Sequence, residues 1–393
     1  MPGAGATVTG PDNGLIRPGS GFAIRMSELM AARGHSFRSL GRAVTANPGY
    51  LNKLATGSRG APGPTLAAAI DRELGADGEL AALARQEHAP PAVPGQRPMG
   101  DTEAANIRAT VQHLVALDTL QGSGGLTPIA TRAFRAAADR LAVVGGSADV
   151  RSAAADLGAA AAWIASDDVQ RDHSRNIALE ALALADLAGD TRLHRFLLSH
   201  LSMVAEHGGR YADALAFAER LLAENHDNPR VEAMVEIRRA RALSGLGAHT
   251  DALEAWDRAE HLLTASPSAD DGLTYWIHSS EMAIHKAVVL TRAHDRHAVD
   301  WAHRGVEWLP AGQGRDQVLF RAMLLSDAVE AHAWSEVPRI VEDLLQFAGA
   351  AGTARVPELL DRIWNDVARG RVPAAAKDAV YAACTAFNGT PTG

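Results

Sequence analysis

Apolar residues along this chain recur three and four positions apart, as on one face of a helix, and nowhere alternate as in a strand of any length. In the first part, short periods broken by Gly, Pro or Asn predict helices over about 22–33, after Ser36, after Asn47 and over 65–74. From Asp101 onward, longer Ala- and Leu-rich periods predict helices throughout. The pattern therefore predicts an all-α protein.

The segment from Ser36 to Gly57 predicts two short helices joined by a tight turn. Ser36 and Asn47 are side chains that accept hydrogen bonds from free backbone N–H groups at helix starts, and Pro48 suits a first turn. Gly41 lies within the first of these helices, where glycine costs about 1 kcal/mol relative to alanine. Close packing of the next helix against Gly41 would explain a glycine at this position. The alternative explanation is that the helix is simply weak. In the preceding helix Ile24, Leu29 and Met30 are expected to face inward.

Polar side chains remain on the outer face of the helix after Asn47, and they suit the major groove of DNA. Asn amides pair with adenine, and Lys reaches guanine or phosphate. Tyr50 either contacts a phosphate or packs beneath the next helix. The predicted base-reading residues are Asn47, Tyr50, Asn52 and Lys53. The predicted phosphate contacts are Arg38, Arg42, Ser58 and Arg59.

Charge is distributed unevenly along the chain. The net charge of −8 argues against nucleic acid, but residues 21–60 hold six basic residues against Glu28 alone, a net of +5. Residues 61–393 then carry −13. Because phosphate attraction is local and screened, a basic segment within an acidic protein can bind DNA.

Residues 22–83 resemble the lambda-repressor-like, or xenobiotic-response-element-type, helix-turn-helix family. The residues that carry the resemblance are Ser36, Phe37, Leu40, Gly41, Val44, Tyr50, Leu51, Leu54 and Gly57, followed by Pro64-Thr65-Leu66. The resemblance implies a five-helix domain that binds double-stranded DNA. A single domain of this size binds weakly, so a homodimer on two half-sites is expected. The turn at residues 58–60 carries fewer basic residues than is usual for the family.

Proline and glycine gather before Asp101, which predicts an extended spacer. The predicted domains are a flexible tail over 1–20, a helix-turn-helix domain over 21–87, a linker over 88–100 and helical repeats over 101–388.

An internal repeat follows. Residues 209–218 are similar to residues 247–256 at an offset of 38, with a weaker copy at 295–302. Such two-helix units bury their apolar faces by stacking on one another. They resemble the tetratricopeptide family, in which a small residue of each second helix lets the hairpin close. The residues that fit this role are Ala214, Ala252 and Ala298. The resemblance implies a right-handed α-solenoid.

The repeats contain one set of candidate effector-binding residues. His278, Glu281 and His285 are spaced to share a helical face near Trp276, which either lines a groove or packs in the core. A zinc site or a polar network would explain the set, and the wide His spacing favours the network. No catalytic or cofactor motif occurs, so neither an enzyme nor a cofactor or metal is predicted.

As a whole, the chain resembles actinobacterial regulators that join such a helix-turn-helix to tetratricopeptide-like repeats. This implies control of transcription through an effector that is a small molecule, a peptide or a protein. The alternative is an adaptor that does not bind DNA and uses both modules for protein–protein interaction. A single cysteine, Cys384, and the absence of a signal peptide or an apolar span predict a cytoplasmic protein without membrane contact.

Overall fold

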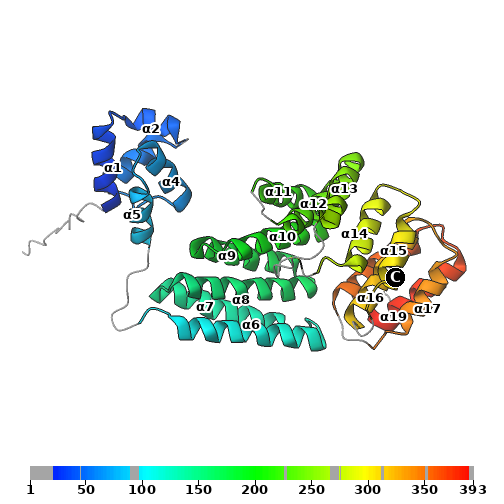
Figure 1. Cartoon of the computed structure of the whole chain (residues 1–393). Coiled ribbons are helices and arrows are strands. Elements are labelled where there is room, and N and C mark those ends of the chain that lie inside the picture. Colours follow the sequence, from blue (N-terminus) through cyan, green and yellow to red (C-terminus); the bar gives the residue numbers. More distant parts are fainter. Residues whose placement is uncertain are drawn as a thin grey trace, which may run out of the picture. The chain divides into compact units, whose positions relative to one another are not determined.

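The computed structural model describes residues 21–44, 46–88, 97–224, 228–265, 274, 276–310, 314–349 and 353–388. These residues form nineteen α-helices and no strand beyond an isolated bridge between Met99 and Gly146, which confirms the all-α prediction (Figure 1). None of the described helices has the length and apolar character needed to span a bilayer. The chain divides into two compact units, unit 1 mainly from residues 1–96 and unit 2 mainly from residues 97–393.

Unit 1 contains five helices around one apolar core. They are α1 (Gly21–Ala32), α2 (Phe37–Ala43), α3 (Pro48–Ala55), α4 (Pro64–Glu73) and α5 (Glu79–His88). The buried face of α1 is formed by Phe22, Met26 and Met30, four residues apart. Ile24 is 52% exposed, so its predicted inward position was wrong. The face through Phe22 leaves Ile24 on the opposite side of the helix.

Local chemistry fixes the turn between α2 and α3. Ser36 caps α2 by accepting from the Ser39 N–H, and Asn47 Oδ1 caps α3 by accepting from Gly49 N–H at 2.8 Å. Gly41 is buried, and a Cβ placed on it would lie 2.6 Å from the backbone oxygen of Ala46. The close approach expected at this glycine is therefore present, and it is made by the turn itself.

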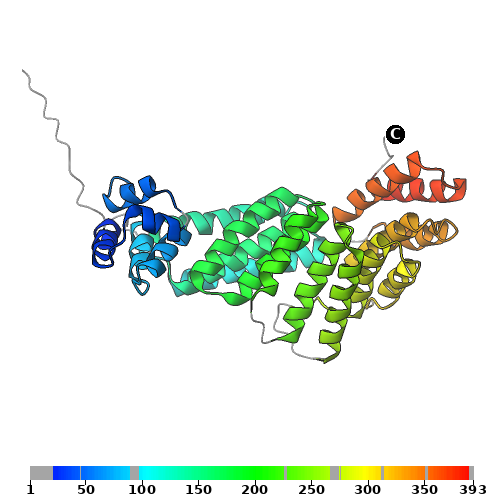
Figure 2. The same cartoon turned by 90° about the horizontal axis from the view of Figure 1, so that it is seen from above.

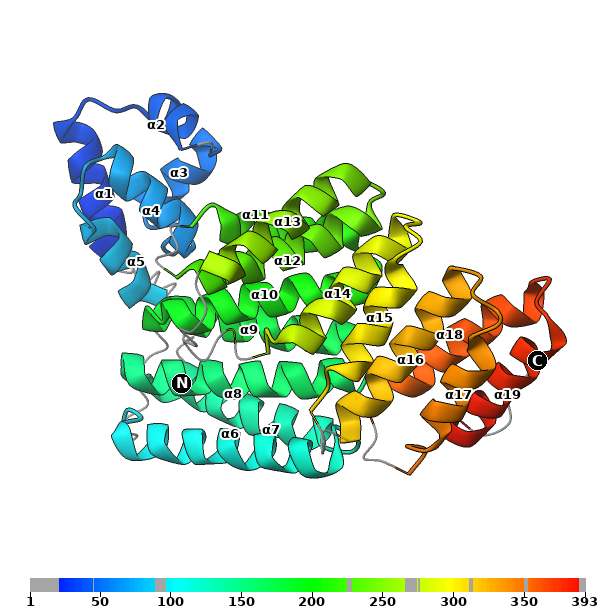
Figure 3. The same ribbon diagram turned by 45° about the vertical axis from the view of Figure 1, so that its right-hand side comes forward.

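Unit 2 is a series of fourteen described helices, drawn in order along the chain in Figure 3. They are α6 (Asp101–Gln121), α7 (Thr127–Val144), α8 (Ala148–Asp167), α9 (Arg171–Ala188), α10 (Thr191–His207), α11 (Tyr211–Leu222), α12 (Pro229–Gly245), α13 (His249–Ala265), α14 (Ser279–Arg292), α15 (Ala298–Glu307), α16 (Gly314–Glu330), α17 (Val337–Leu345), α18 (Arg355–Arg369) and α19 (Ala374–Asn388).

The even-numbered helices of unit 2 form an inner row. From α6 to α18, each packs against the next even-numbered helix, and from α8 onward each also packs against the odd-numbered helix that follows it. Figure 2 shows the middle helices, α8 to α13, lying alongside one another. The small residues predicted for hairpin closure, Ala214, Ala252 and Ala298, are buried near the starts of α11, α13 and α15.

One turn geometry recurs at the end of five inner helices, α8, α10, α12, α14 and α16. At each, a left-handed residue donates its N–H to the carbonyl three residues back, and the next residue donates to the carbonyl five back. The left-handed residues are Val169, Gly209, Gly247, His294 and His332. Sequence similarity found the copies at Gly209 and Gly247 because glycine favours this conformation. The others use residues that adopt it less readily.

Polar bonds join early helices of unit 2 to α16 and α18. Arg315 of α16 lies 2.9 Å from Asp118 of α6 and 2.7 Å from Asp167 of α8. Arg171 of α9 bonds both carboxylate oxygens of Glu358 in α18. These pairs link helices that are far apart in the chain.

Candidate functional sites

The residues predicted to contact DNA lie on the surface of unit 1. Arg38 and Arg42 are exposed on α2, Asn52 and Lys53 are exposed on α3, and Ser58 and Arg59 are exposed in the loop that follows. On the same helix Leu51 and Leu54 are buried, which directs Asn52 and Lys53 outward. The structure thus brings all these polar groups onto two helices and one loop.

Two predicted base-reading residues also have structural roles. Asn47 is exposed, but its Oδ1 already accepts from backbone N–H groups of α3, which leaves its amide NH₂ as the free donor. Tyr50 is half-buried and packs against the apolar core, with the Arg59 guanidinium 5.1 Å from its ring centroid. Tyr50 therefore helps to position Arg59.

The charge on this surface is uncompensated. Residues 36–63 contain four basic residues and no Asp or Glu. Among the described residues, none forms an ion pair with Arg38, Arg42, Lys53 or Arg59. By contrast, Arg25 on α1 is paired with Glu28 at 3.0 Å and with Glu79 at 2.8 Å. An anion is therefore attracted to the α2–α3 side of unit 1.

The candidate effector residues of unit 2 are only partly brought together. Trp276, Glu281 and His285 line one cavity, with the ring centroids of Trp276 and His285 5.4 Å apart. His278 precedes α14 and caps it, since its Nδ1 accepts from the backbone N–H of Glu281 at 3.5 Å. The prediction that His278 shares a helical face with the other two was wrong because the helix begins one residue later. In the described part of the chain, no group of His, Cys, Asp or Glu is arranged as a metal site.

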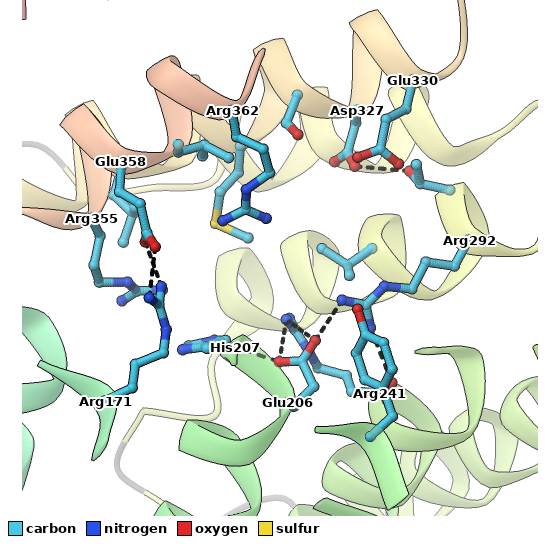
Figure 4. A pocket seen from close by; sticks show the side chains of 17 residues that line it. Arg171, Glu206, His207, Arg241, Arg292, Asp327, Glu330, Arg355, Glu358 and Arg362 are labelled. Carbon is cyan, nitrogen blue, oxygen red and sulfur yellow. Dashed lines mark hydrogen bonds and ion pairs between the residues drawn. The ribbon is translucent and has the colours of Figure 1, made fainter. Parts of the chain in front are cut away.

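A central cavity opens within unit 2, lined by α9, by the start of α11, by Trp276 and by inner-row helices from α8 to α18. It has a polar compartment of about 150 Å³ and a more apolar compartment of about 100 Å³. Both compartments are lined by His207, Arg241, Leu319, Met323 and Arg355. Figure 4 shows the polar compartment, with Arg171 facing Glu358 and with Glu206 facing Arg241 and Arg292.

Glu206 is the anionic centre of the polar compartment. Its side chain is 4% exposed and lies 2.9 Å from Arg241 and 2.6 Å from Arg292. Burial raises its pKa, but the neighbouring guanidiniums, Arg241 above all, outweigh burial and hold the pKa well below its usual range. Glu206 is therefore ionised, and one carboxylate is shared by two arginines.

Within the described part of the chain, two other guanidiniums in the cavity form no ion pair with a carboxylate. Arg238 bonds the Ser199 hydroxyl at 3.1 Å and lies 4.7 Å from the Trp276 ring centroid. Burial and the nearby Arg241 lower the pKa of Arg238 to about 10. The side chain of Arg355 has no hydrogen bond or ion pair among the described residues, and Arg241 Nε is buried without a partner there. The cavity therefore has an excess of positive charge.

Several other titratable groups of the inner row are shifted toward neutrality by burial. Burial, reinforced by Asp316, raises the pKa of Glu281 to about 7. Burial also raises the pKa of Asp327 to about 7, against a hydrogen bond donated by Thr291 at 2.8 Å. His200 is buried beside Phe196, and burial followed by repulsion from Arg238 lowers its pKa to about 3. These groups favour their neutral forms in the folded protein.

The raised pKa of Asp327 predicts a pH-dependent stability. Between the usual pKa of Asp and about pH 7, Asp327 binds more protons in the folded protein than in the unfolded chain. The contribution of Asp327 to the free energy of unfolding is therefore present at low pH and is lost as the pH rises. Asp327→Asn removes this loss. The stability of the variant relative to the unmodified protein is expected to rise by at least about 1 kcal/mol between pH 5 and pH 8. Urea titrations at both pH values measure it, and a constant difference would contradict the assignment.

The sequence did not single out the cavity's ionic residues. Glu206, Arg238 and Arg241 sit on helices whose neighbouring positions are buried and apolar. The sequence feature that could have indicated these residues is the presence of charges within the apolar faces of α10 and α12, since charges are rarely buried unless paired.

No protein-family model matches the chain, and a comparison with curated proteins gives no significant relative.

Proposed function

We propose that the protein is a sequence-specific DNA-binding transcriptional regulator, in which unit 1 is a helix-turn-helix domain and unit 2 binds an effector. The observation that carries the proposal is the exposed α2–α3 surface, which has four unpaired basic side chains and lacks acidic residues over 36–63. Phosphate contacts from such a surface supply affinity, and base contacts from α3 supply specificity.

The form of α3 supports a role in base reading. Its apolar side chains Leu51 and Leu54 anchor it to the core, while Asn52 and Lys53 remain free on the outer side. The close turn at Gly41 sets α2 against α3, the pair of helices that a helix-turn-helix places across the backbone and in the major groove. A homodimer would supply the two half-sites that such a small module needs.

The recurring turns of unit 2 support a tetratricopeptide-like solenoid of helical hairpins. Five inner helices end in the same left-handed turn, and small buried residues begin three of the outer helices. A stack of this kind provides a surface for a partner or an effector. We place the effector of the regulator in the central cavity of the inner row.

Asn52→Ala is expected to weaken specific DNA binding by about 1–3 kcal/mol, because an amide that reads a base edge is lost. A binding sequence is first selected from randomised duplexes with the full-length protein, and affinities are then measured by fluorescence anisotropy. Asn106→Ala, at an exposed asparagine of α6, is the matched control. Equal affinity of the Asn52 variant and the control would place the reading helix elsewhere.

Arg42→Gln is expected to weaken binding to all duplexes similarly and to reduce the slope of log affinity against log salt by about 1. The physical reason is the loss of one phosphate contact and its released counterion. Anisotropy titrations over a series of salt concentrations give the slope. If the unmodified protein shows no salt-dependent DNA binding, the adaptor function replaces the regulator.

A further inference from the structure

The central cavity of unit 2 has the charge pattern of an anion site. Arg241 and Arg292 together face a single ionised carboxylate, Glu206. Arg171 is balanced by Glu358. Among the described residues, Arg238 and Arg355 then remain without a bonded carboxylate, which leaves positive charge on the apolar compartment and, through Arg355, on the polar one. A buried guanidinium is stable when it meets an anion that satisfies its donors.

The apolar compartment next to these arginines indicates the other half of the ligand. Its wall contains aromatic rings and methionine side chains, which give an adaptable hydrophobic lining. The residues are Trp163, Phe196, Met203, Met234, Trp276 and Phe320. Its volume of about 100 Å³ suits a short alkyl chain or a single ring better than a folded segment or a long peptide.

Two acidic groups that line the cavity, Glu206 and Glu281, are compatible with a bound anion. Glu206 is already bonded by two arginines. Glu281 lies 3.5 Å from His285 Nε2 and lines the apolar compartment, and burial raises its pKa to about 7. In its protonated form Glu281 donates a hydrogen bond, so it can bind a carboxylate oxygen instead of repelling it.

We propose that this cavity binds a small organic monocarboxylic acid. Arg355 and Arg238 hold the carboxylate, and the apolar body of the acid lies against the aromatic and methionine wall. The identification of this acid as the effector rests on the proposed function, whereas its binding to unit 2 does not require DNA.

The test uses a panel of monocarboxylates, from butyrate to decanoate and from phenylacetate to indole-3-acetate, each with its primary amide. Binding to the full-length protein is followed by calorimetry and by tryptophan emission, since all seven tryptophans lie in unit 2. At least one acid is expected to bind at least about tenfold more tightly than its amide, because the amide lacks the charge that the arginines require. Binding of no acid, or equal binding of acid and amide, overturns the proposal.

Arg355→Gln is expected to weaken binding of that acid at least about tenfold. The variant should fold, because the side chain of Arg355 has no hydrogen-bond or ion-pair partner to lose among the described residues, and burial lowers its pKa in spite of attraction from Asp167 and Glu281. Arg339→Gln, at an exposed arginine of α17, is the charge-matched control and should bind normally. Unchanged affinity of the Arg355 variant overturns the site, and tighter binding of phenyl phosphate than of phenylacetate overturns the carboxylate assignment.

DNA binding is measured separately on the same preparations. A protein that binds its selected duplex but no acid of the panel overturns this inference and leaves the proposed function intact. A protein that binds an acid through Arg355 but shows no salt-dependent DNA binding supports the cavity site and removes the regulator.

Discussion

Glu206→Gln is expected to destabilise unit 2 by about 3 kcal/mol, the typical cost of removing one partner from a buried ion pair. The glutamine keeps the size of the side chain but removes the charge that Arg241 and Arg292 share. Arg241 is then left buried without a carboxylate, at 6% side-chain exposure. Urea unfolding followed by tryptophan emission measures the change, because the tryptophans report on unit 2 alone.

Glu219→Gln provides the matched control for this substitution. Glu219 also pairs with an arginine, Arg239 at 2.7 Å, but its side chain is 46% exposed. Water screens such a pair, so the control is expected to lose less than about 1 kcal/mol. Equal losses for the two variants would show that Glu206 is not the buried anionic centre described here.

Gly41→Val is expected to destabilise unit 1 by about 3 kcal/mol, at the upper end of the usual cost of overpacking. A Cβ at this position would lie 2.6 Å from the Ala46 backbone oxygen and 3.3 Å from Pro48 Cγ. A backbone oxygen cannot rotate away as a side chain can. The Ala46 N–H also donates to the Gly41 carbonyl at 2.8 Å, so any shift of the turn strains this bond.

Hydrogen exchange of peptides from residues 21–88 measures the effect of Gly41→Val, and tryptophan emission of unit 2 provides an internal control. Gly60→Ala is the comparison variant, because its added Cβ meets nothing within 4 Å. Exchange is expected to accelerate in the Gly41 variant and to stay nearly unchanged in the Gly60 variant. The Gly41 variant should lose DNA binding together with the protection of its unit 1 amides from exchange. Normal exchange in Gly41→Val would mean that the turn is looser than the structure shows.

Features of the fold that depend on neighbouring residues could be predicted from the sequence. The caps at Ser36 and Asn47 follow from side chains that satisfy nearby backbone donors, and the crowding at Gly41 follows from a glycine placed where it costs helix stability. The buried face of α1 was harder to predict from the sequence, because Phe22, Ala23 and Ile24 are consecutive and all apolar. Only packing against the rest of unit 1 decides which of them turns inward.

The cavity could not be predicted because its residues come from helices far apart in the chain. Arg238 and Arg355 are separated by more than a hundred positions, and their common cavity depends on the path of the whole inner row. Trp276, Glu281 and His285 line one cavity, because they are close together in the chain and Trp276 lies just before α14. The prediction that His278 lies within the helix was wrong by one residue, because His278 caps α14 and helix boundaries are the least certain part of such a prediction.

The bonds from Arg315 to Asp118 and Asp167 have a consequence for how unit 2 can vary. In an open stack each hairpin touches only its neighbours, so hairpins can be gained or lost with little effect elsewhere. Here Arg315 ties α16 to α6 and α8, and Arg171 with Glu358 ties α9 to α18. Inserting or deleting a hairpin between these helices would separate the paired residues. The pairs therefore constrain the number of hairpins between α9 and α16, and the helices from α6 to α18 should denature together.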